Sequence, residues 1–439
     1  YFFLFSSWER YGERAGSRQD CQLGQPNQMR ILHFSDVHIG VENYGRPDPE
    51  TGLSTRLADF LDTLDEVVDY ALENKVDLAL FCGDAYKSRD PSQTHQREFA
   101  KRIAKLSSAG VPVFMVVGNH DMPFTASRAN ALEIFRTLDV SNVHTGDTLD
   151  VYRVNTPSGP IQVLAVPWIR RSTFLSRDNT RGMTPDQLND AIQSAMTDLI
   201  RGKAESLDPA IPAVLAGHVS VSQARTSSEQ TMMLGRDHVL LMSAVALPQL
   251  DYVALGHIHS RQELETSPPV IYSGSLQRVD FGEEKDDKGF YIVDIDTALP
   301  QGQRVAQYAF HEVAARNFLT VSVDIPRGDL DPTAKVIAAI NRHYFEDAVV
   351  RVMITVPADL DGLLRDTDIR RALDGAHYIA AISREVAGET RTRLGQAHAE
   401  TLDPAEALAM YMSSRNLPKD RAKVLMDHAT ELMGEEEPE

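Results

Sequence analysis

The sequence predicts an α/β fold in which two β-sheets pack together between outer layers of helices, a four-layer α/β/β/α sandwich. Two observations lead to this prediction. Between residues 29 and 117, short apolar runs alternate with amphipathic helical stretches, which indicates a largely parallel sheet with helices outside it. From residue 148 onward, strand-like runs follow one another with short links, which indicates a second sheet packed on the first.

The first helix is predicted over 56–72, where apolar residues recur at the spacing of a buried helix face. These residues are Leu57, Phe60, Leu61, Leu64, Val67, Val68 and Ala71. A strand over 76–82 follows, then a helix over about 92–109 and a strand over 112–117. The later strands are predicted at 148–154, 161–166, 213–216, 251–255, 269–273 and 289–295.

Residues that commonly bind metals follow five of the apolar runs. They are Asp36 and His38; Asp84 after Gly83; Asn119, His120 and Asp121 after Gly118; His218 after Gly217; and His257 and His259 after Gly256. In open α/β sheets, ligands gather beyond the carboxyl ends of the strands. Each motif alone is also compatible with an ordinary turn or a surface pair, but five in this order make that reading improbable.

Carboxylates and imidazoles together suit manganese, zinc or iron, and the lack of thiolates argues against a structural zinc cage. Two divalent ions about 3.5–4 Å apart can clamp a phosphate and activate a water molecule for in-line attack. Glycine before a ligand permits a sharp turn or a close approach of the backbone. The pattern therefore predicts a two-metal phosphoesterase. The other histidines lack this context and are interpreted as ordinary: His33, His95, His144, His238, His311, His343, His377, His398 and His428.

The succession Asp-x-His, Gly-Asp, Gly-Asn-His-Asp, Gly-His and Gly-His-x-His resembles the pattern of the calcineurin-like metallophosphoesterases. Within that superfamily, segments 29–40, 83–92 and 255–262 are similar to the SbcD family of DNA repair exonucleases, the nuclease subunits of the SbcCD complex. The motifs carry the resemblance over about residues 29–290, and the remainder is similar in layout only.

The resemblance implies two divalent ions, most often Mn²⁺, and a role for each motif residue. One ion would be held by Asp36, His38, Asp84 and His259, and the other by Asp84, Asn119, His218 and His257. His120 would face the scissile phosphate and protonate the leaving oxygen or stabilise the transition state. Asp121 would orient the imidazole of His120, as carboxylates commonly do.

Candidate phosphate contacts lie in loops near these motifs, at Lys87, Arg89, Arg170, Arg171 and Arg278. Lys87 departs from the family pattern, because relatives often have His or Asp there. The net charge of −19 opposes DNA binding overall, but segments 86–105 and 166–181 are locally basic. The alternative for 97–105 is a solvated helix face. We expect weak DNA binding by this chain alone, with a partner adding positive surface.

Residues 29–311 are predicted to form the nuclease domain, in which the charged turn 281–289 is interpreted as a structural hairpin. Residues 1–28 are expected to be a disordered extension before a natural start at Met29, or else a genuine N-terminal appendage. Residues 312–386 predict a small α+β module that resembles the family's capping domain. Its elements are a strand over 318–325, a helix over 332–345 that starts at Asp331-Pro332, a strand over 348–356, a helix over 366–374 and a strand over 377–386.

After a linker over 387–401, residues 402–434 predict two short helices, followed by an acidic tail over 435–439. A helix pair of this size cannot bury its own apolar face and must dock on something. The resemblance implies docking on the coiled coil of an SbcC-type ATPase; the alternative is packing onto this chain's own domains. The resemblance also implies a homodimer.

Composition places few further limits on function. The chain has 42% hydrophobic and 24% charged residues, as in an ordinary globular protein, and no apolar run approaches the ~20 residues of a membrane span. Its two cysteines, Cys21 and Cys82, form no disulfide framework, which fits a reducing cytoplasm, and the resemblance implies association with the nucleoid.

Three functions are compatible with these observations. The first is a Mn-dependent nuclease that acts with an SMC-like ATPase in double-strand break repair, for which the resemblance implies exonuclease and endonuclease action on DNA ends, single strands and hairpins. The second is a phosphoesterase acting on small nucleotides or other phosphodiesters, for which a capping module and a helical tail are unnecessary. The third is a non-enzymatic scaffold, which the complete ligand set argues against.

Overall fold

The computed structural model describes residues 27–123, 125, 128–169, 183–226 and 239–387, together with 408, 412, 421, 423–426 and 428–429. These residues belong to two compact units. The larger runs to Thr320 and includes Tyr344–Arg351 and Leu373–Ala381, and the smaller contains Val321–His343, Val352–Ala372 and the residues from Ile382 on. The expected acidic tail lies outside the described residues, as do all of the expected linker except Ala387, nearly all of the expected extension and most of the C-terminal helix pair.

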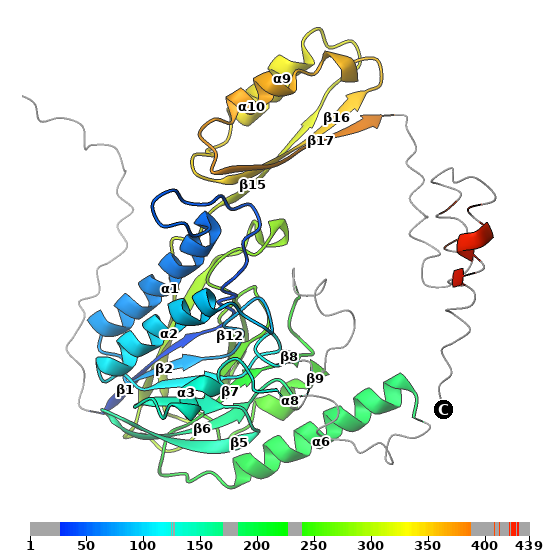
Figure 1. Cartoon of the computed structure of the whole chain (residues 1–439). Coiled ribbons are helices and arrows are strands. Elements are labelled where there is room, and N and C mark those ends of the chain that lie inside the picture. The colour runs from blue at the N-terminus through cyan, green and yellow to red at the C-terminus, as the bar shows by residue number, and fades with distance from the viewer. Residues whose placement is uncertain are drawn as a thin grey trace, which may run out of the picture. The chain divides into compact units, whose positions relative to one another are not determined.

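The first sheet of the larger unit contains the early strands of the chain (Figure 1). Four parallel strands, β1 (Gln28–Phe34), β2 (Leu78–Phe81), β3 (Val113–Val116) and β4 (Val143–Gly146), are extended by antiparallel β13 (Gly289–Asp296) and β14 (Val305–Glu312). The strand order is β14-β13-β1-β2-β3-β4. Helices α1 (Thr55–Glu73), α2 (Gln93–Ser108) and the short α3 (Glu133–Thr137) lie between these strands in the chain.

The second sheet has the order β11-β12-β10-β7-β6-β5. Its parallel strands are β6 (Gly159–Val166), β7 (Ala213–His218), β10 (Tyr252–Gly256) and β12 (Pro269–Tyr272). The antiparallel edges are β5 (Asp150–Thr156) and β11 (Gln262–Thr266). Helices α6 (Pro185–Glu205) and α8 (Met242–Val245) accompany this sheet, and β8 (Ser220–Val221) pairs with β9 (Val239–Leu240).

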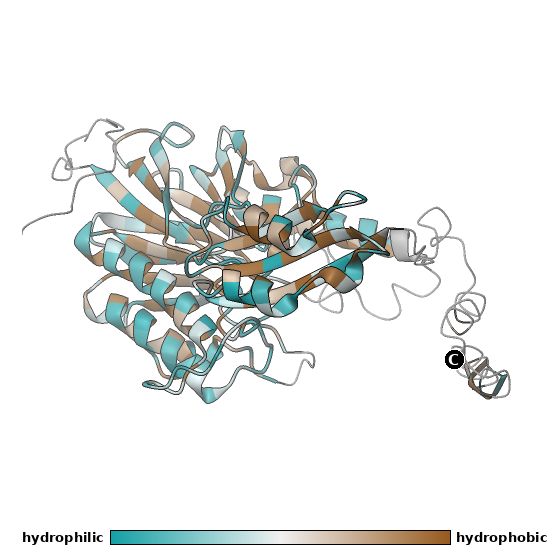
Figure 2. Cartoon of the chain, turned by 90° about the horizontal axis from the view of Figure 1, so that it is seen from above, coloured by the Kyte–Doolittle hydropathy of each residue, from teal (hydrophilic) through white to brown (hydrophobic). Residues whose placement is uncertain are grey.

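Three groups of buried side chains show that the larger unit has four layers. The group between the sheets includes Ile31 and Phe114 from the first sheet and Val163 from the second. A second group joins the first sheet to α1 and α2, and a third joins the other sheet to α6. In Figure 2 the strands are mostly apolar in colour and the helices carry polar colour. The predicted α/β/β/α sandwich is confirmed.

The smaller unit and the strands that lead into it contain the predicted β-α-β-α-β succession. The elements are β15 (Phe318–Asp324), α9 (Pro332–Ile340), β16 (Val349–Pro357), the 3-10 turn η2 (Asp361–Leu363), α10 (Asp366–Ala372) and β17 (Tyr378–Ala387). The strands pair in the order β15-β16-β17. Asp331 caps α9 as predicted, by accepting a hydrogen bond from Ala334 N. The predicted extent of this helix to residue 345 is wrong, because residues 341–344 are all exposed and have no apolar face to bury.

Several further elements were not predicted, and the longest of them are the helix α6 and the edge strand β14. A start signal for α6 is nevertheless readable in the sequence, because Thr184, Pro185 and Gln187 form a capping box with proline at the first turn. None of the described helices has the length and apolarity of a membrane-spanning segment.

One histidine is buried between the sheets. His33 Nε2 donates to the carbonyl oxygen of Leu255 at 3.2 Å, and Nδ1 accepts from the hydroxyl of Tyr252 at 3.0 Å. Burial lowers the pKa of His33 to about 3 and outweighs the hydrogen bond to Leu255, which acts in the opposite direction. His33 is therefore a neutral core residue that links the two sheets.

The lowered pKa of His33 predicts that the stability of the fold depends on pH. The unfolded chain binds a proton at His33 below about pH 6.5, whereas the folded chain binds it only near pH 3, so stability falls as the pH drops through that window. Between pH 7 and 5 the wild type should lose about 2 kcal/mol more than His33→Gln, at ~1.4 kcal/mol per pK unit. Urea denaturation at both pH values measures this difference, and parallel losses in the two proteins would contradict the prediction.

Candidate metal centre

The motif residues meet where the carboxyl ends of five parallel strands converge. Asp36 and His38 follow β1, Asp84 follows β2 and Asn119 follows β3, all in the first sheet. His218 ends β7 in the second sheet, and His257 and His259 follow β10. All seven side chains are buried. Because the two sheets pack face to face, their strand ends bring residues that are 223 positions apart in the sequence, such as Asp36 and His259, into one site.

The backbone of these loops is held in uncommon conformations. Asp36, His38, Asp84 and His257 have positive φ values of 51°, 50°, 61° and 94°. Such residues cost about 1–3 kcal/mol each and persist only where the surroundings fix them. Here the amide of Asp36 donates to the carbonyl oxygen of Gly83 at 3.0 Å, and the amide of His38 donates to that of Asp84 at 3.1 Å. The first two loops therefore hold each other in place.

Two of the predicted glycines are required by close approach. A Cβ atom on Gly118 would lie 2.1 Å from Oδ1 of Asp84. A Cβ atom on Gly83, which has a φ of 92°, would lie 2.4 Å from Nδ1 of His218. Any larger residue at either position would displace a candidate ligand, so the absence of a side chain is part of the site.

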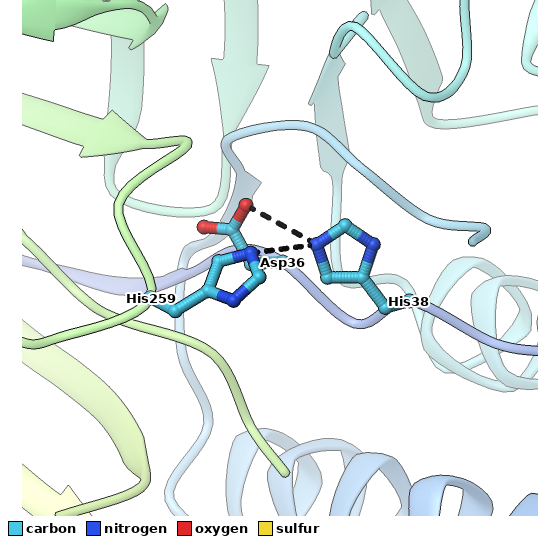
Figure 3. Close-up of side chains that lie close together, drawn as sticks. All are labelled: Asp36, His38 and His259. Carbon is cyan, nitrogen blue, oxygen red and sulfur yellow. Dashed lines mark hydrogen bonds and ion pairs between the residues drawn. The ribbon is translucent and has the colours of Figure 1, made fainter. Parts of the chain in front are cut away.

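The first group of converging ligand atoms comes from Asp36, His38 and His259 (Figure 3). The Nε2 atoms of His38 and His259 are 2.9 Å apart, and Nε2 of His38 is 3.9 Å from Oδ1 of Asp36. One ligand atom from each residue lies within 4.8 Å of the others. Two ring nitrogens that face each other beside a carboxylate suit a shared cation.

The second group is made by Asp84, Asn119, His218 and His257. Oδ1 of Asn119 is 2.9 Å from Nε2 of His218 and 3.1 Å from Nδ1 of His257. Oδ2 of Asp84 is 3.4 Å from Nε2 of His218 and 3.7 Å from Nε2 of His38. Asp84 therefore lies between the two groups, which is the position expected of a bridging ligand.

The electrostatics of the site also fit divalent cations. Burial alone would raise the pKa of Asp84, but His218, His120 and His38 outweigh burial and hold that pKa well below its usual range. Burial would lower the pKa of His218, but Asp84 and Asp36 reverse this effect and raise it to about 9. A proton on His218 thus balances the buried carboxylates in the absence of metal, and a cation bound there would take over that role.

His120 lies beside this site, and its ring is oriented differently from the expectation. Nδ1 of His120 is 2.7 Å from the carbonyl oxygen of Lys87, which can only accept, so Nδ1 carries the proton.

The expected role of Asp121 is therefore corrected. Its carboxylate accepts hydrogen bonds from the amides of Asp84, Ala85 and Gly118 at 2.9–3.0 Å and holds two ligand loops together. Burial, followed by the charge of Asp84, raises the pKa of Asp121 to about 7.

The candidate phosphate-binding residues differ in their exposure and in their contacts. Arg278 is nearly buried and donates to the carbonyl oxygens of Ala315, Arg316 and Asp286, which is a structural role. Lys87 and Arg89 are half-buried in the loop after β2, so they stay candidates. Arg170 and Arg171 lie outside the described residues.

The basic residues of α2 are engaged in ion pairs. Glu98 pairs with Arg97 at 2.8 Å and with Lys101 and Arg102 at 2.9 Å. Arg102 and Lys105 also pair with Asp65 and Asp69 of α1 at 2.5 Å. These contacts favour the alternative of a solvated helix face for 97–105 over a phosphate-binding rim.

The sequence did not point to Glu283. This residue lies in the 3-10 turn η1 (Phe281–Glu283), within the segment predicted to be only a structural hairpin. Its Oε1 atom is 2.7 Å from Nδ1 of His259. An acidic residue in a charged turn carries no local signal for such a contact, because the partner is brought there by the packing of η1 against the loop after β10.

Comparison with known proteins identifies the class. Residues 29–261 match the family described as calcineurin-like phosphoesterase, and the chain belongs to that family. Among curated relatives, it is 26% identical to the DNA double-strand break repair protein Mre11 of Thermoplasma acidophilum and 28% identical to the SbcD subunit of the SbcCD nuclease of Bacillus subtilis. These alignments cover 62% and 61% of this chain, and 64% and 66% of the respective relatives.

A longer alignment is found with the SbcD subunit of the SbcCD nuclease of Rhodobacter capsulatus. The identity is 27%, and the alignment covers 86% of this chain and 90% of that protein. The likeness to this relative therefore extends beyond the part that matches the family model.

The close approach at Gly118 predicts that alanine is harmful at this position but tolerated at a glycine with free space around it. Gly118→Ala should weaken the binding of divalent metal at least about tenfold, because the added methyl group displaces the carboxylate of Asp84. Gly202→Ala is the matched control: it lies in α6 with nothing within 4 Å of the new methyl group, and it should stabilise the helix by about 0.5–1 kcal/mol. Titration calorimetry and urea denaturation test both effects. Wild-type metal affinity in Gly118→Ala would disprove the steric argument.

Proposed function

We propose that this chain is a metal-dependent nuclease that hydrolyses DNA phosphodiester bonds and acts as the nuclease subunit beside an SMC-like ATPase in double-strand break repair. The observation that carries the proposal is the carboxylate of Asp84, buried between two groups of imidazoles with His120 at its side. The names of the relatives, an Mre11 repair protein and two SbcCD nuclease subunits, support DNA as the substrate. We propose Mn²⁺ as the ion.

Two bound cations would polarise a phosphodiester and activate water. Asp36, His38 and His259 would hold one of them, and Asn119, His218 and His257 the other, with Asp84 shared. Asp121 keeps the loops of Asp84 and Gly118 at a fixed separation. The ligand geometry is thus formed by the protein before a substrate arrives, which lowers the cost of organising it during the reaction.

His120 is proposed to act on the leaving group. Its Nδ1–H is engaged by the carbonyl oxygen of Lys87, so Nε2 is the ring atom available to a phosphate oxygen. Its main-chain amide donates to Oδ1 of Asp84 at 2.8 Å, which ties the imidazole to the bridging carboxylate. Only the imidazolium form of His120 carries a second proton at Nε2; burial lowers the pKa of His120, and the negative charge of a bound phosphate would favour that form. Its Nε2 proton would pass to the departing oxygen and leave the neutral Nδ1–H tautomer, a step that contributes about 10²–10⁴-fold in enzymes of many kinds.

The partner and the remaining parts of the chain belong to the same proposal. We propose residues 312–386 as a capping module and 402–434 as the segment that binds an SbcC-type coiled-coil ATPase, with two copies of the nuclease subunit per complex. The alignment over 86% of this chain with a subunit of a two-part nuclease supports an arrangement of this kind. Co-purification with a coiled-coil ATPase, lost on truncation at residue 401, tests it.

The catalytic proposal predicts different defects for two variants. With end-labelled duplex and single-stranded DNA and Mn²⁺, His120→Ala should reduce cleavage about 10²–10⁴-fold while both ions still bind. Asp84→Ala should lose cleavage together with metal binding. His343→Ala, at an exposed histidine, should cleave like the wild type.

Controls with EDTA, Mg²⁺ and a small phosphodiester complete this assay. Loss of both ions in His120→Ala would contradict the assigned role. Hydrolysis of the small diester without DNA cleavage, even after the ATPase is added, would favour a phosphoesterase acting on small phosphodiesters.

A further inference from the structure

The carboxylate of Glu283 contacts a candidate metal ligand from outside the site. Glu283 is fully buried, and its Oε1 atom lies 2.7 Å from Nδ1 of His259. Its Oε2 atom accepts hydrogen bonds from the amide of Val279 at 3.1 Å and from the hydroxyl of Ser275 at 3.3 Å. The carboxylate is thus held at both oxygens, and its direction toward His259 is fixed.

A buried lysine supplies the opposite charge. Nζ of Lys288 lies 2.7 Å from Oε2 of Glu283, and both side chains are inaccessible to solvent. The same ammonium donates to the carbonyl oxygen of His259 at 3.1 Å and to Oγ of Ser275 at 2.9 Å. Lys288 therefore binds both the backbone of His259 and the carboxylate that contacts its ring. A fully desolvated ion pair contributes little to stability on average, which favours a role other than stabilising the fold.

This geometry selects one tautomer of His259. A carboxylate paired with an ammonium group can only accept hydrogen bonds, so Nδ1 of His259 carries the proton. The lone pair is then on Nε2, the atom that lies 2.9 Å from Nε2 of His38 within the first ligand group. Histidines that bind metals are commonly oriented in this way by a second residue, whose removal costs about 10–100-fold in metal affinity.

The turn that carries Glu283 is itself anchored. The neighbouring Glu284 accepts hydrogen bonds from Thr320, at 2.9 Å from its amide and also from its hydroxyl. Arg351 donates to Oγ1 of Thr320 at 2.8 Å, and its guanidinium lies 4.3 Å from the ring centroid of Phe281. Contacts from Thr320 of β15 and Arg351 of β16 thus anchor the turn η1, from which Glu283 reaches His259.

We propose that Glu283, held by Lys288, is the positioning residue of His259: it fixes the Nδ1–H tautomer and directs Nε2 toward the first metal position. This inference rests on the proposed two-metal function and adds a residue outside the family motifs. The same pair explains why a segment that reads as a surface turn contains two fully buried charges.

The test uses double variants, because removing one partner alone would leave a buried charge unpaired. Glu283→Leu/Lys288→Met removes the acceptor, and Glu283→Gln/Lys288→Met restores a neutral one. Mn²⁺ titration of the full chain should show one of two sites weakened about 10–100-fold in the first variant and partly recovered in the second. The matched control is Asp251→Leu/Arg304→Met, which deletes another buried ion pair, 3.3 Å long, and should leave both sites unchanged.

A measurement on the wild type decides the tautomer even if a variant fails to fold. In metal-free protein with ¹⁵N-labelled histidine, His259 should show a protonated Nδ1 and an unprotonated Nε2. A protonated Nε2 with a bare Nδ1, or unchanged Mn²⁺ affinity in Glu283→Leu/Lys288→Met, would overturn the inference while leaving the two-metal proposal intact. A wild type that binds no Mn²⁺ would instead overturn the proposed function and this inference with it.

Discussion

The buried carboxylate of Asp84 is the constraint on which the rest of the site depends. A carboxylate removed from water needs positive charge or hydrogen-bond donors around it. The chain supplies imidazoles on both sides, the amide of His120 at 2.8 Å and a loop held by Asp121. Because these groups come from strands of both sheets, the charge can be balanced only when the sheets are packed together. Folding and assembly of the site are therefore one event.

The layered fold supplies the rigidity that this arrangement requires. The ligands follow short strands whose side chains are almost all buried. Positive φ values at Asp36, Asp84 and His257 are tolerated because neighbouring loops bond to one another. Around this core, further groups fix the orientation of two imidazole rings. The carbonyl oxygen of Lys87 orients the ring of His120, and Glu283 orients the ring of His259. The chemistry of the site is thus determined by hydrogen bonds that lie one layer outside the ligands.

Much of the site was predictable because its residues sit in short motifs after strands. Asp36, His38, Asn119 and His218 follow apolar runs, and parallel strands bring their carboxyl ends to one edge of a sheet. The contacts of Asp121 and Glu283 were not predicted from the sequence. Asp121 was assigned to the adjacent imidazole, yet its partners are amides 37, 36 and 3 positions away in sequence. Sequence adjacency carried no information about the direction of that side chain.

From its own residues and spacing, the chain specified the four-layer architecture, the identities of the candidate ligands and the need for glycine beside them. Periodicity and residue chemistry are local properties, so they can be read without coordinates. Only the tertiary structure, through the packing of the two sheets and the turn η1, determines that Nε2 of His259 faces His38. It also determines that Arg278 donates to carbonyl oxygens and that Lys288 is buried beside Glu283. These features depend on contacts between segments that are distant in the sequence. Only the folded backbone determines how the side chains of such segments are oriented toward one another.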